Sequence, residues 1–356
     1  MKKVKAIFFL FPAMGGSERV TIDIACALDR CKFDVSFVIV GASTGTVASF
    51  IPEGMRVSHI HLYNIWCFPV FKIWRFLKKE DPDIVFSSVM CLNARIILAA
   101  RLHGKAKIIV RNDNMISYYA RRVLLPAKIA YPKADLIIAQ TEEMHSELSG
   151  FIPKCAGKII TLHNPMNMAR IDAMLNGASS PFPSNGKRHI ISVGSVCYSK
   201  GQDLLIEAFA RLHEQQQDTD LYIIGPYDGN DNFYAGLKSL IQTYGLGDDV
   251  HFTGLLDNPY KWMHYCDCFV LPSRIEGLPN VLLEAMYCGA SVVSTDCVPI
   301  VKRIVSSGHN GFIVPTGDAS ALYKSIIRAL EFKDFSMTFK ISSISDFTRL
   351  FEMELV

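Results

Sequence analysis

The sequence predicts an α/β protein with two doubly wound, parallel-sheet domains. A chain of 356 residues exceeds what one hydrophobic core usually holds. Short, continuous apolar runs alternate with amphipathic segments, which is typical of strands covered by helices on both faces. A cluster of breakers and small polar residues at 176–186 separates two such series. We therefore expect one Rossmann-like domain over residues 1–167 and a second over 168–356, facing each other across a cleft.

Thirteen apolar runs are expected to be strands. In the first domain they are Ala6–Leu10, Val35–Val40, Val57–Ile60, Ile84–Ser88, Lys107–Val110, Leu136–Ala139 and Lys158–Leu162. In the second they are His189–Val193, Leu221–Ile224, Val250–Phe252, Cys268–Leu271, Ser291–Ser294 and Phe312–Val314. Residues 166–187 are interpreted as the linker. For the last residues of the chain two alternatives stay open: they belong to the second domain, or they pack back on the first.

The cysteines and the N-terminus indicate a cytoplasmic protein. The ten cysteines have no framework spacing, which favours reduced, buried thiols over zinc ligands or disulfides. The N-terminal run after Lys5 imitates a secretory signal, but it is short, is broken by Pro12 and leads directly into Gly15 and Gly16. A first parallel strand explains it better.

The charge is unevenly distributed along the chain. The net charge is +3, but residues 1–167 hold 22 Lys and Arg against 13 Asp and Glu. A basic half suits nucleic acid, an anionic membrane or a phosphate-bearing acceptor, and a surface without a partner is the alternative. Residues 64–79 and 118–125 interleave aromatic and basic side chains, a pattern of interfacial membrane contact or of ordinary helix packing.

A glycine pair follows the first expected strand. Gly15 and Gly16 let the backbone approach a ligand closely at the start of a helix. Such turns are common, so this signal is weak by itself. Ser17 is readily interpreted as a helix cap, and Glu18 and Arg19 as solvated residues of the first turn.

The most informative stretch is 273–290, Ser-Arg-Ile-Glu-Gly-Leu-Pro-Asn-Val-Leu-Leu-Glu-Ala-Met-Tyr-Cys-Gly-Ala. It follows a buried strand, and a helix is expected to begin near Pro279 or Asn280. The amides and dipole of that helix favour an anion, while Glu276 and Glu284 need hydroxyl donors. A nucleoside diphosphate sugar carries phosphates for the amides and hydroxyls for the carboxylates.

This stretch resembles the signature of family-4 retaining glycosyltransferases with the GT-B fold, which include capsule, lipopolysaccharide and exopolysaccharide enzymes. The resemblance implies transfer of a hexose or N-acetylhexosamine from a nucleoside diphosphate sugar, with UDP favoured over GDP, to a glycan or lipid-linked acceptor. It also implies a cytoplasmic enzyme with no nucleic-acid partner. The basic first half and its aromatic stretches are compatible with a peripheral contact to anionic lipid at the inner face of the plasma membrane.

The resemblance also implies site residues. Glu276 and Lys200 are the expected catalytic pair, with Lys200 on the diphosphate and Glu276 on the donor sugar. Lys200 lies in Gly-Ser-Val-Cys-Tyr-Ser-Lys-Gly, where relatives carry an arginine at the position of Ser195. The other expected substrate-binding residues are Gly15, Gly16, Arg111, Asp113, Ser195, Gly254, Gly277, Leu278, Asn280, Val281 and Glu284.

No metal or cofactor is expected. Asp81-Pro82-Asp83 matches the Asp-x-Asp motif of another glycosyltransferase fold, but it sits where a helix turns into a strand, where Asp and Pro are ordinary. Three rival functions stay open: a nucleotide-sugar epimerase of the same architecture, a non-catalytic nucleotide-sugar-binding protein and, less favoured because the dinucleotide glycine fingerprint is missing, a nicotinamide dehydrogenase.

Overall fold

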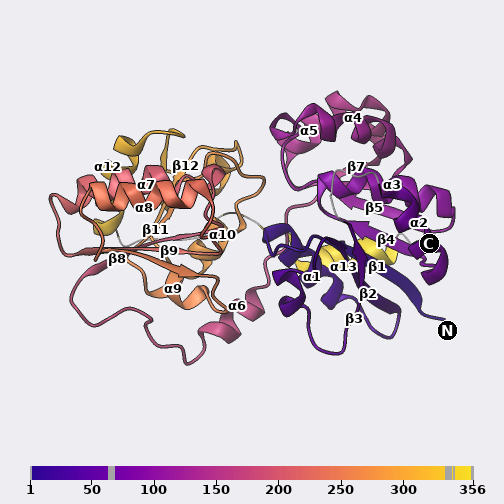
Figure 1. Cartoon of the computed structure of the whole chain (residues 1–356), viewed down its shortest axis with the longest axis horizontal. Coiled ribbons are helices and arrows are strands. Elements are labelled where there is room, and N and C mark those ends of the chain that lie inside the picture. The colour runs from indigo at the N-terminus through magenta and orange to yellow at the C-terminus, as the bar shows by residue number, and fades with distance from the viewer. Residues whose placement is uncertain (1, 63–68, 333–338, 340, 354–356) are drawn as a thin grey trace. The chain divides into compact units, whose positions relative to one another are not determined.

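A computed structural model describes residues 2–62, 69–332, 339 and 341–353. The chain forms two compact units. Unit 1 comprises Met1–Asn167 and Ile341–Val356, and unit 2 comprises Met168–Lys340. Each unit has a parallel sheet with helices on both faces (Figure 1).

Unit 1 has a seven-stranded sheet in the order β3-β2-β1-β4-β5-β6-β7. Its strands are β1 Val4–Leu10, β2 Phe33–Gly41, β3 Arg56–His61, β4 Ile84–Ser87, β5 Lys107–Arg111, β6 Leu136–Ala139 and β7 Ile159–Thr161. Its helices are α1 Gly16–Ala27, α2 Val70–Glu80, α3 Met90–His103, α4 Arg121–Ala130, α5 Glu142–Phe151 and α13 Ile344–Met353.

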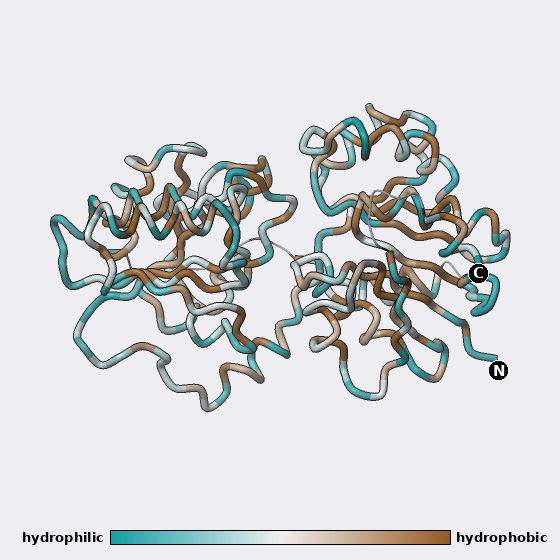
Figure 2. Tube along the Cα trace, in the orientation of Figure 1, coloured by the Kyte–Doolittle hydropathy of each residue, from teal (hydrophilic) through white to brown (hydrophobic). Residues whose placement is uncertain are grey.

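Two hydrophobic cores flank this sheet. Helices α2, α3, α4 and α5 contribute to one core, and α1 and α13 contribute to the other. The strands that separate them appear as continuous hydrophobic segments in Figure 2. Helix α13 comes from the end of the chain, and its Phe351 lies fully buried with its ring 5.5 Å from that of Phe8 on β1. The last described helix therefore completes the core under the first strand.

Unit 2 has a six-stranded sheet in the order β10-β9-β8-β11-β12-β13. Its strands are β8 Arg188–Val193, β9 Thr219–Ile224, β10 Val250–Gly254, β11 Cys268–Leu271, β12 Val292–Thr295 and β13 Phe312–Val314. Its helices are α6 Met168–Leu175, α7 Gln202–His213, α8 Asn232–Thr243, α9 Tyr260–Tyr265, α10 Asn280–Tyr287, α11 Val301–Ile304 and α12 Ala319–Glu331.

All thirteen expected runs are strands in the described residues, and no end differs from the expected one by more than two residues. The segment 166–187, which was interpreted as the linker, includes a short helix that was not predicted, α6 at Met168–Leu175. This short helix is fixed by tertiary contacts: Asn258 Nδ2 donates to the carbonyl of Met174 at 2.8 Å, and the Tyr287 hydroxyl donates to Asp172 at 2.9 Å.

Both sheets reverse their strand order at one point, between β1 and β4 in unit 1 and between β8 and β11 in unit 2. In open α/β sheets, the loops that leave the carboxyl ends of the strands at such a reversal diverge to opposite faces and form a crevice where ligands bind. The fold therefore predicts a ligand site at one edge of each sheet. These edges are formed by the loops after β1, β4 and β5 in unit 1, and by the loops after β8 and β11 in unit 2.

Candidate active site

The reversal point of unit 2 brings the two expected catalytic residues together. Lys200 lies between β8 and α7, and Glu276 lies between β11 and α10. The Nζ atom of Lys200 is 2.6 Å from Oε1 of Glu276, and the hydroxyl of Ser273 donates to the same oxygen at 2.7 Å. Two loops that are 76 residues apart in the sequence thus share one ion pair.

This pair is largely shielded from solvent. The side chain of Lys200 is 28% exposed and that of Glu276 is 10% exposed. Burial lowers the pKa of Lys200, but the charge of Glu276 and its hydrogen bond outweigh burial and leave that pKa raised. Lys200 therefore stays cationic at neutral pH. Because an ammonium group has three donors, it can keep Glu276 and still bind a phosphate oxygen.

A second ion pair ties the same two loops together. Arg274 donates to both carboxylate oxygens of Asp203 at 2.7 Å, and its guanidinium lies 4.1 Å from the ring centre of Tyr198. The amide of Arg274 also donates to the carbonyl of Ser199 at 2.7 Å. Bidentate arginine pairs fix geometry as well as charge. Arg274 lies within the motif at 273–290, but its pairing with Asp203 depends on the fold and was not predicted.

Glycines allow the strand-end loops of unit 2 to touch. Gly201 has φ +67°, and a Cβ atom there would lie 2.1 Å from the carbonyl oxygen of Pro272. Gly225 has φ +145°, and a Cβ atom there would lie 2.2 Å from the carbonyl oxygen of Gly194. Only glycine fits both the backbone angle and the space at these positions. The amide of Gly225 donates to the carbonyl of Gly254 at 2.9 Å, which places Gly254 in the adjoining loop.

The remaining expected residues of unit 2 line the same edge. Gly277 and Leu278 are buried in the turn before α10, whose N-cap Pro279 makes no side-chain cap. Asn280 and Val281 form the first turn of α10, and Glu284 follows one turn later, half-buried. The carbonyl of Ser195 accepts a hydrogen bond from Gln202 Nε2 at 3.0 Å, so that residue braces the start of α7.

In unit 1, the expected residues belong to a polar network at the carboxyl ends of β5, β6 and β7. Arg111 is 1% exposed and donates through Nε and Nη2 to Asn164 Oδ1 at 3.0 and 2.6 Å. Asn164 donates in turn to Gln140 Oε1 at 2.9 Å. Asp113 accepts hydrogen bonds from the Met90 amide at 3.0 Å and the Tyr119 hydroxyl at 2.6 Å.

The glycine turn of unit 1 differs from expectation at Ser17 and Glu18. Ser17 is not the helix cap, because it lies within α1 and makes no side-chain cap hydrogen bond. Gly15 is the N-cap of α1 and Gly16 is its first residue, as the sequence indicated. Glu18, however, is 6% exposed, so its interpretation as a solvated residue was wrong. Its position in the first turn turns it inward, toward Arg111 and Asp113, whose charges act on it. A local sequence pattern cannot show this, because the partners come from a strand more than 90 residues away.

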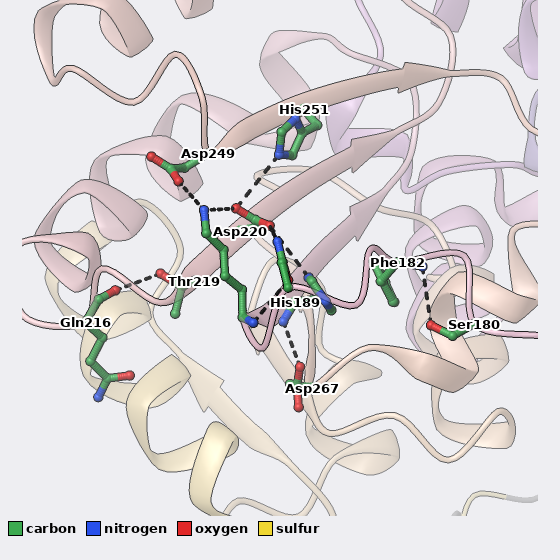
Figure 3. Close-up of polar contacts among 11 residues, drawn as sticks. Ser180, Phe182, His189, Gln216, Thr219, Asp220, Asp249, His251 and Asp267 are labelled. Carbon is green, nitrogen blue, oxygen red and sulfur yellow. Dashed lines mark hydrogen bonds and ion pairs between the residues drawn. The ribbon is translucent and has the colours of Figure 1, made fainter.

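A charged cluster that the sequence analysis missed lies at the opposite edge of the unit 2 sheet, where β8, β9 and β10 begin (Figure 3). Lys187 Nζ lies 2.8 Å from Asp220 Oδ1 and 2.6 Å from Asp249 Oδ1. His189 and His251 each place a ring nitrogen 3.9 Å from Asp220. Because it sits at the amino ends of the strands, away from the reversal-point loops, we assign this cluster to stability.

The described residues contain no group of three or more His, Cys, Asp or Glu side chains arranged to hold a metal ion. The acids of Asp81-Pro82-Asp83 have structural partners. Asp83 accepts a hydrogen bond from the Lys5 amide at 2.9 Å, and Asp81 accepts one from Lys105 Nζ at 2.8 Å. These contacts agree with the interpretation of the motif as a turn between α2 and β4.

Comparison with known proteins identifies both halves of the chain. Residues 14–170 match the model for Glycosyltransferase Family 4, and residues 179–342 match the model for Glycosyl transferases group 1. An uncharacterized glycosyltransferase of Methanocaldococcus jannaschii is 29% identical over 65% of this chain, a match that spans 61% of that protein. An N-acetylgalactosaminyltransferase of Campylobacter jejuni, which acts on a diphospho-undecaprenol-linked sugar, is 26% identical over 91% of this chain and 89% of its own.

Solved structures agree with the fold. The HepE protein of Anabaena in complex with UDP and glucose superposes with a TM-score of 0.76 over 99% of both chains at 17% identity. The predicted fold class, with two Rossmann-like domains, is thereby confirmed, as is the resemblance on which the family assignment was based. The chain belongs to the glycosyltransferases that join a family-4 domain to a group 1 domain.

Proposed function

We propose that this glycosyltransferase is a metal-independent, retaining enzyme of bacterial surface polysaccharide synthesis that uses a UDP-sugar and a glycan or lipid-linked acceptor. The pairing of Lys200 with Glu276 at the reversal point of unit 2 carries this proposal. The Campylobacter relative, which is named for transfer of N-acetylgalactosamine to an undecaprenol-linked substrate, and the HepE complex with UDP support the classes of acceptor and nucleotide.

The residues of unit 2 suit a diphosphate leaving group. As the bond between the anomeric carbon and the phosphate oxygen breaks, negative charge grows on the diphosphate. Lys200 and the N-terminal amides of α10 supply fixed positive charge for it, which is the usual source of electrostatic catalysis. Glu276 accepts hydrogen bonds from the donor-sugar hydroxyls. The acceptor oxygen attacks the anomeric carbon from the face on which the diphosphate departs, so the configuration is retained. An oxygen of the departing phosphate takes the proton of the acceptor hydroxyl.

The test is an assay of the full chain with UDP-N-acetylgalactosamine, UDP-glucose and GDP-mannose, using octyl glycosides as acceptors. We expect UDP-sugars to raise the melting temperature more than GDP-mannose does, and transfer to proceed in EDTA with an α-linked product by NMR. An epimerised donor formed without acceptor supports the epimerase instead. Nucleotide binding with neither transfer nor hydrolysis supports the non-catalytic protein.

Replacing Glu284 by alanine is expected to raise the apparent KM for the donor about tenfold while leaving kcat nearly unchanged. We assign Glu284 to the ribose hydroxyls, which are bound equally in the ground state and the transition state, and loss of such uniform binding appears in KM. Donor titrations at saturating acceptor measure it. Glu214→Ala, at an exposed position after α7, serves as the control. A fall in kcat with KM unchanged contradicts this role.

We also propose that unit 1 binds the inner face of the plasma membrane through α2, α4 and the end of α3. No described helix has the length and apolar character needed to cross a bilayer. The exposed apolar side chains on these helices are Phe71, Leu102, Leu125 and Ile129, and the exposed basic ones on α2 and α4 are Lys72, Arg75, Lys78, Lys79, Arg121, Arg122 and Lys128. Residues 64–68 of the first aromatic stretch lie outside the described residues.

Phe71→Ser combined with Ile129→Ser is expected to lower binding to vesicles of phosphatidylethanolamine and phosphatidylglycerol about tenfold, because two large side chains lose their apolar burial. Co-sedimentation of the full chain measures it. Tyr244→Ser, at an exposed site in unit 2, should leave binding unchanged. Equal binding to vesicles of neutral phosphatidylcholine would speak against a role for the basic residues.

A further inference from the structure

A buried carboxyl group lies at the reversal point of unit 1. Glu18 follows β1 in the first turn of α1 and is 6% exposed. A Cβ atom built at Gly15 would lie 3.1 Å from Glu18 Oε2, so this carboxyl packs against the glycine turn. It accepts hydrogen bonds from the backbone amides of Phe11 and of Glu18 itself. A buried carboxyl is unusual unless it is paired, and these amides satisfy only part of its capacity.

The charged and titratable groups that face Glu18 come from two other elements. Asp113 and Arg111, at the end of β5, both act on its charge, and Cys91 on α3 lies close enough for Glu18 to act on its thiol. Two carboxyls thus lie within the electrostatic influence of one guanidinium, and the trio has an excess negative charge when both acids are ionised. Such an arrangement favours a ligand that donates hydrogen bonds.

Arg111 supplies a second and independent sign of a ligand. Its Nε and Nη2 atoms are used by Asn164, but its Nη1 atom is buried and has no hydrogen-bond partner in the described part of the chain. Leaving a buried donor unbonded is costly, so such groups commonly mark a place that water or a substrate fills. Glu18, Asp113 and Arg111 therefore bring together two carboxyls and an unbonded guanidinium nitrogen, which are groups that a polar ligand can satisfy.

Both sheets place charged groups at the carboxyl ends of strands next to the reversal of strand order. In unit 2, Lys200 follows β8 and pairs with Glu276 after β11, at the reversal of strand order. In unit 1, Glu18 follows β1, the strand equivalent to β8, and faces residues at the end of β5, the second strand beyond the reversal. The cationic group of the unit 2 edge is replaced by an acidic one in unit 1. The first suits phosphate and the second suits hydroxyls.

Burial sets the protonation of these acids. It raises the pKa of Glu18 to about 7 against the opposing effect of its backbone amide partners; Asp113 raises that pKa further and Arg111 lowers it. Burial also raises the pKa of Asp113, against its hydrogen bonds from Tyr119 and Met90. Glu18 therefore changes charge near neutral pH, while its hydrogen-bonding capacity as an acceptor is greatest above that pH.

We propose that Glu18 and Asp113 form the acceptor-binding pair of unit 1, in which the ionised carboxylate of Glu18 accepts a hydrogen bond from a hydroxyl of the acceptor sugar. Arg111 is a positioning residue that holds negative charge on the pair. This inference rests on the proposed transferase function and deepens it, because it assigns to Glu18, paired with Asp113, the contact with a hydroxyl of the acceptor sugar.

The test measures binding of octyl N-acetyl-α-galactosaminide and octyl β-glucoside to the full chain saturated with UDP, by saturation-transfer NMR, across the pH range around neutrality. For the wild type, affinity should rise about tenfold as Glu18 ionises. Glu18→Gln should bind about tenfold more weakly above that transition and lose the pH dependence. Glu18→Asp should keep a pH dependence. The affinity for UDP should be the same in all three proteins.

Stability and glycoside binding, measured together, distinguish a ligand-binding role of Glu18 from a purely structural one. Because the pKa of Glu18 is raised on folding, from 4.5 to about 7, the folded protein loses stability as pH rises between those values. Glu18→Gln keeps the neutral shape, so it should be at least as stable as the wild type at alkaline pH while binding the glycosides less well. A less stable variant with unchanged glycoside binding overturns the inference.

Three further outcomes are decisive. Absence of glycoside binding by wild-type protein that still binds UDP overturns the acceptor assignment, as does a pH dependence that persists in Glu18→Gln. Failure of the wild type to bind any UDP-sugar overturns the proposed function itself, so the two failures are distinguishable. Should Glu18→Gln fail to fold, a carbon-13 NMR titration of the Glu18 carboxyl in wild type replaces it, and the glycoside should then lower its pKa.

Discussion

Lys200→Ala is expected to lower turnover about 100-fold, because removing one preorganised group that stabilises developing charge typically costs that much. The ion pair with Glu276 holds the ammonium in place before any donor arrives, at 2.6 Å from the carboxylate. The donor dissociation constant should change less than turnover, since the charge on the diphosphate grows as the glycosidic bond breaks. Steady-state kinetics with a UDP-sugar and direct UDP titration separate the two effects.

Two control variants sharpen this experiment. Lys200→Arg keeps the charge but not the compact ammonium, so it should recover only part of the activity. Lys324→Ala removes a lysine from an exposed position on α12 and should leave turnover unchanged. Thermal unfolding of each variant establishes that it is folded. A folded Lys200→Ala protein with wild-type turnover would remove Lys200 from the mechanism, whatever the donor proves to be.

The strands of this protein could be predicted from its sequence for a physical reason. Parallel strands covered on both faces need apolar side chains at nearly every position, so each is a short, continuous run bounded by turn residues. Helix α10 was predictable because Pro279 precedes its first turn. Helix α6 was not, since one buried residue, Ile171, and hydrogen bonds to distant segments stabilise it.

The candidate site was predictable where a motif is continuous in sequence and not where it is assembled by the fold. Glu276 and Lys200 were found through their flanking glycines and resemblance to a family. The bracing of Arg274 by Asp203 and the burial of Glu18 depend on loops that meet only in the folded sheets. The charge state of these side chains depends on their burial and on neighbouring charges, which cannot be deduced from residue spacing alone.

The charged cluster around Asp220 is likewise assembled by the fold and was not predicted from the sequence. Lys187→Met is expected to lower the stability of unit 2 by about 3 kcal/mol. The side chain of Asp220 is 3% exposed, and Lys187 is the cation that contacts it at 2.8 Å while also contacting Asp249 at 2.6 Å. Methionine keeps the length of the lysine stem but removes the ammonium group that contacts both carboxylates. Native-state hydrogen exchange of β8, β9 and β10 in the full chain reports the loss.

Lys324→Met, which removes an exposed lysine, should change that stability by less than about 0.5 kcal/mol. Lys187→Arg should retain most of the wild-type value, since it restores a cation beside both acids.

The neighbouring His189 makes the effect of Lys187→Met depend on pH. Burial lowers the pKa of His189, so in the wild type this residue is neutral near pH 7 and costs stability only in more acidic solution. Without Lys187, a proton on His189 gains the charge of Asp220, 3.9 Å away, as its counterion. The deficit should therefore shrink from about pH 8 to about pH 5.5, where histidine takes up a proton. A deficit that stays constant over this range would show that the cluster is held by packing and that the charge of Asp220 is solvated by other means.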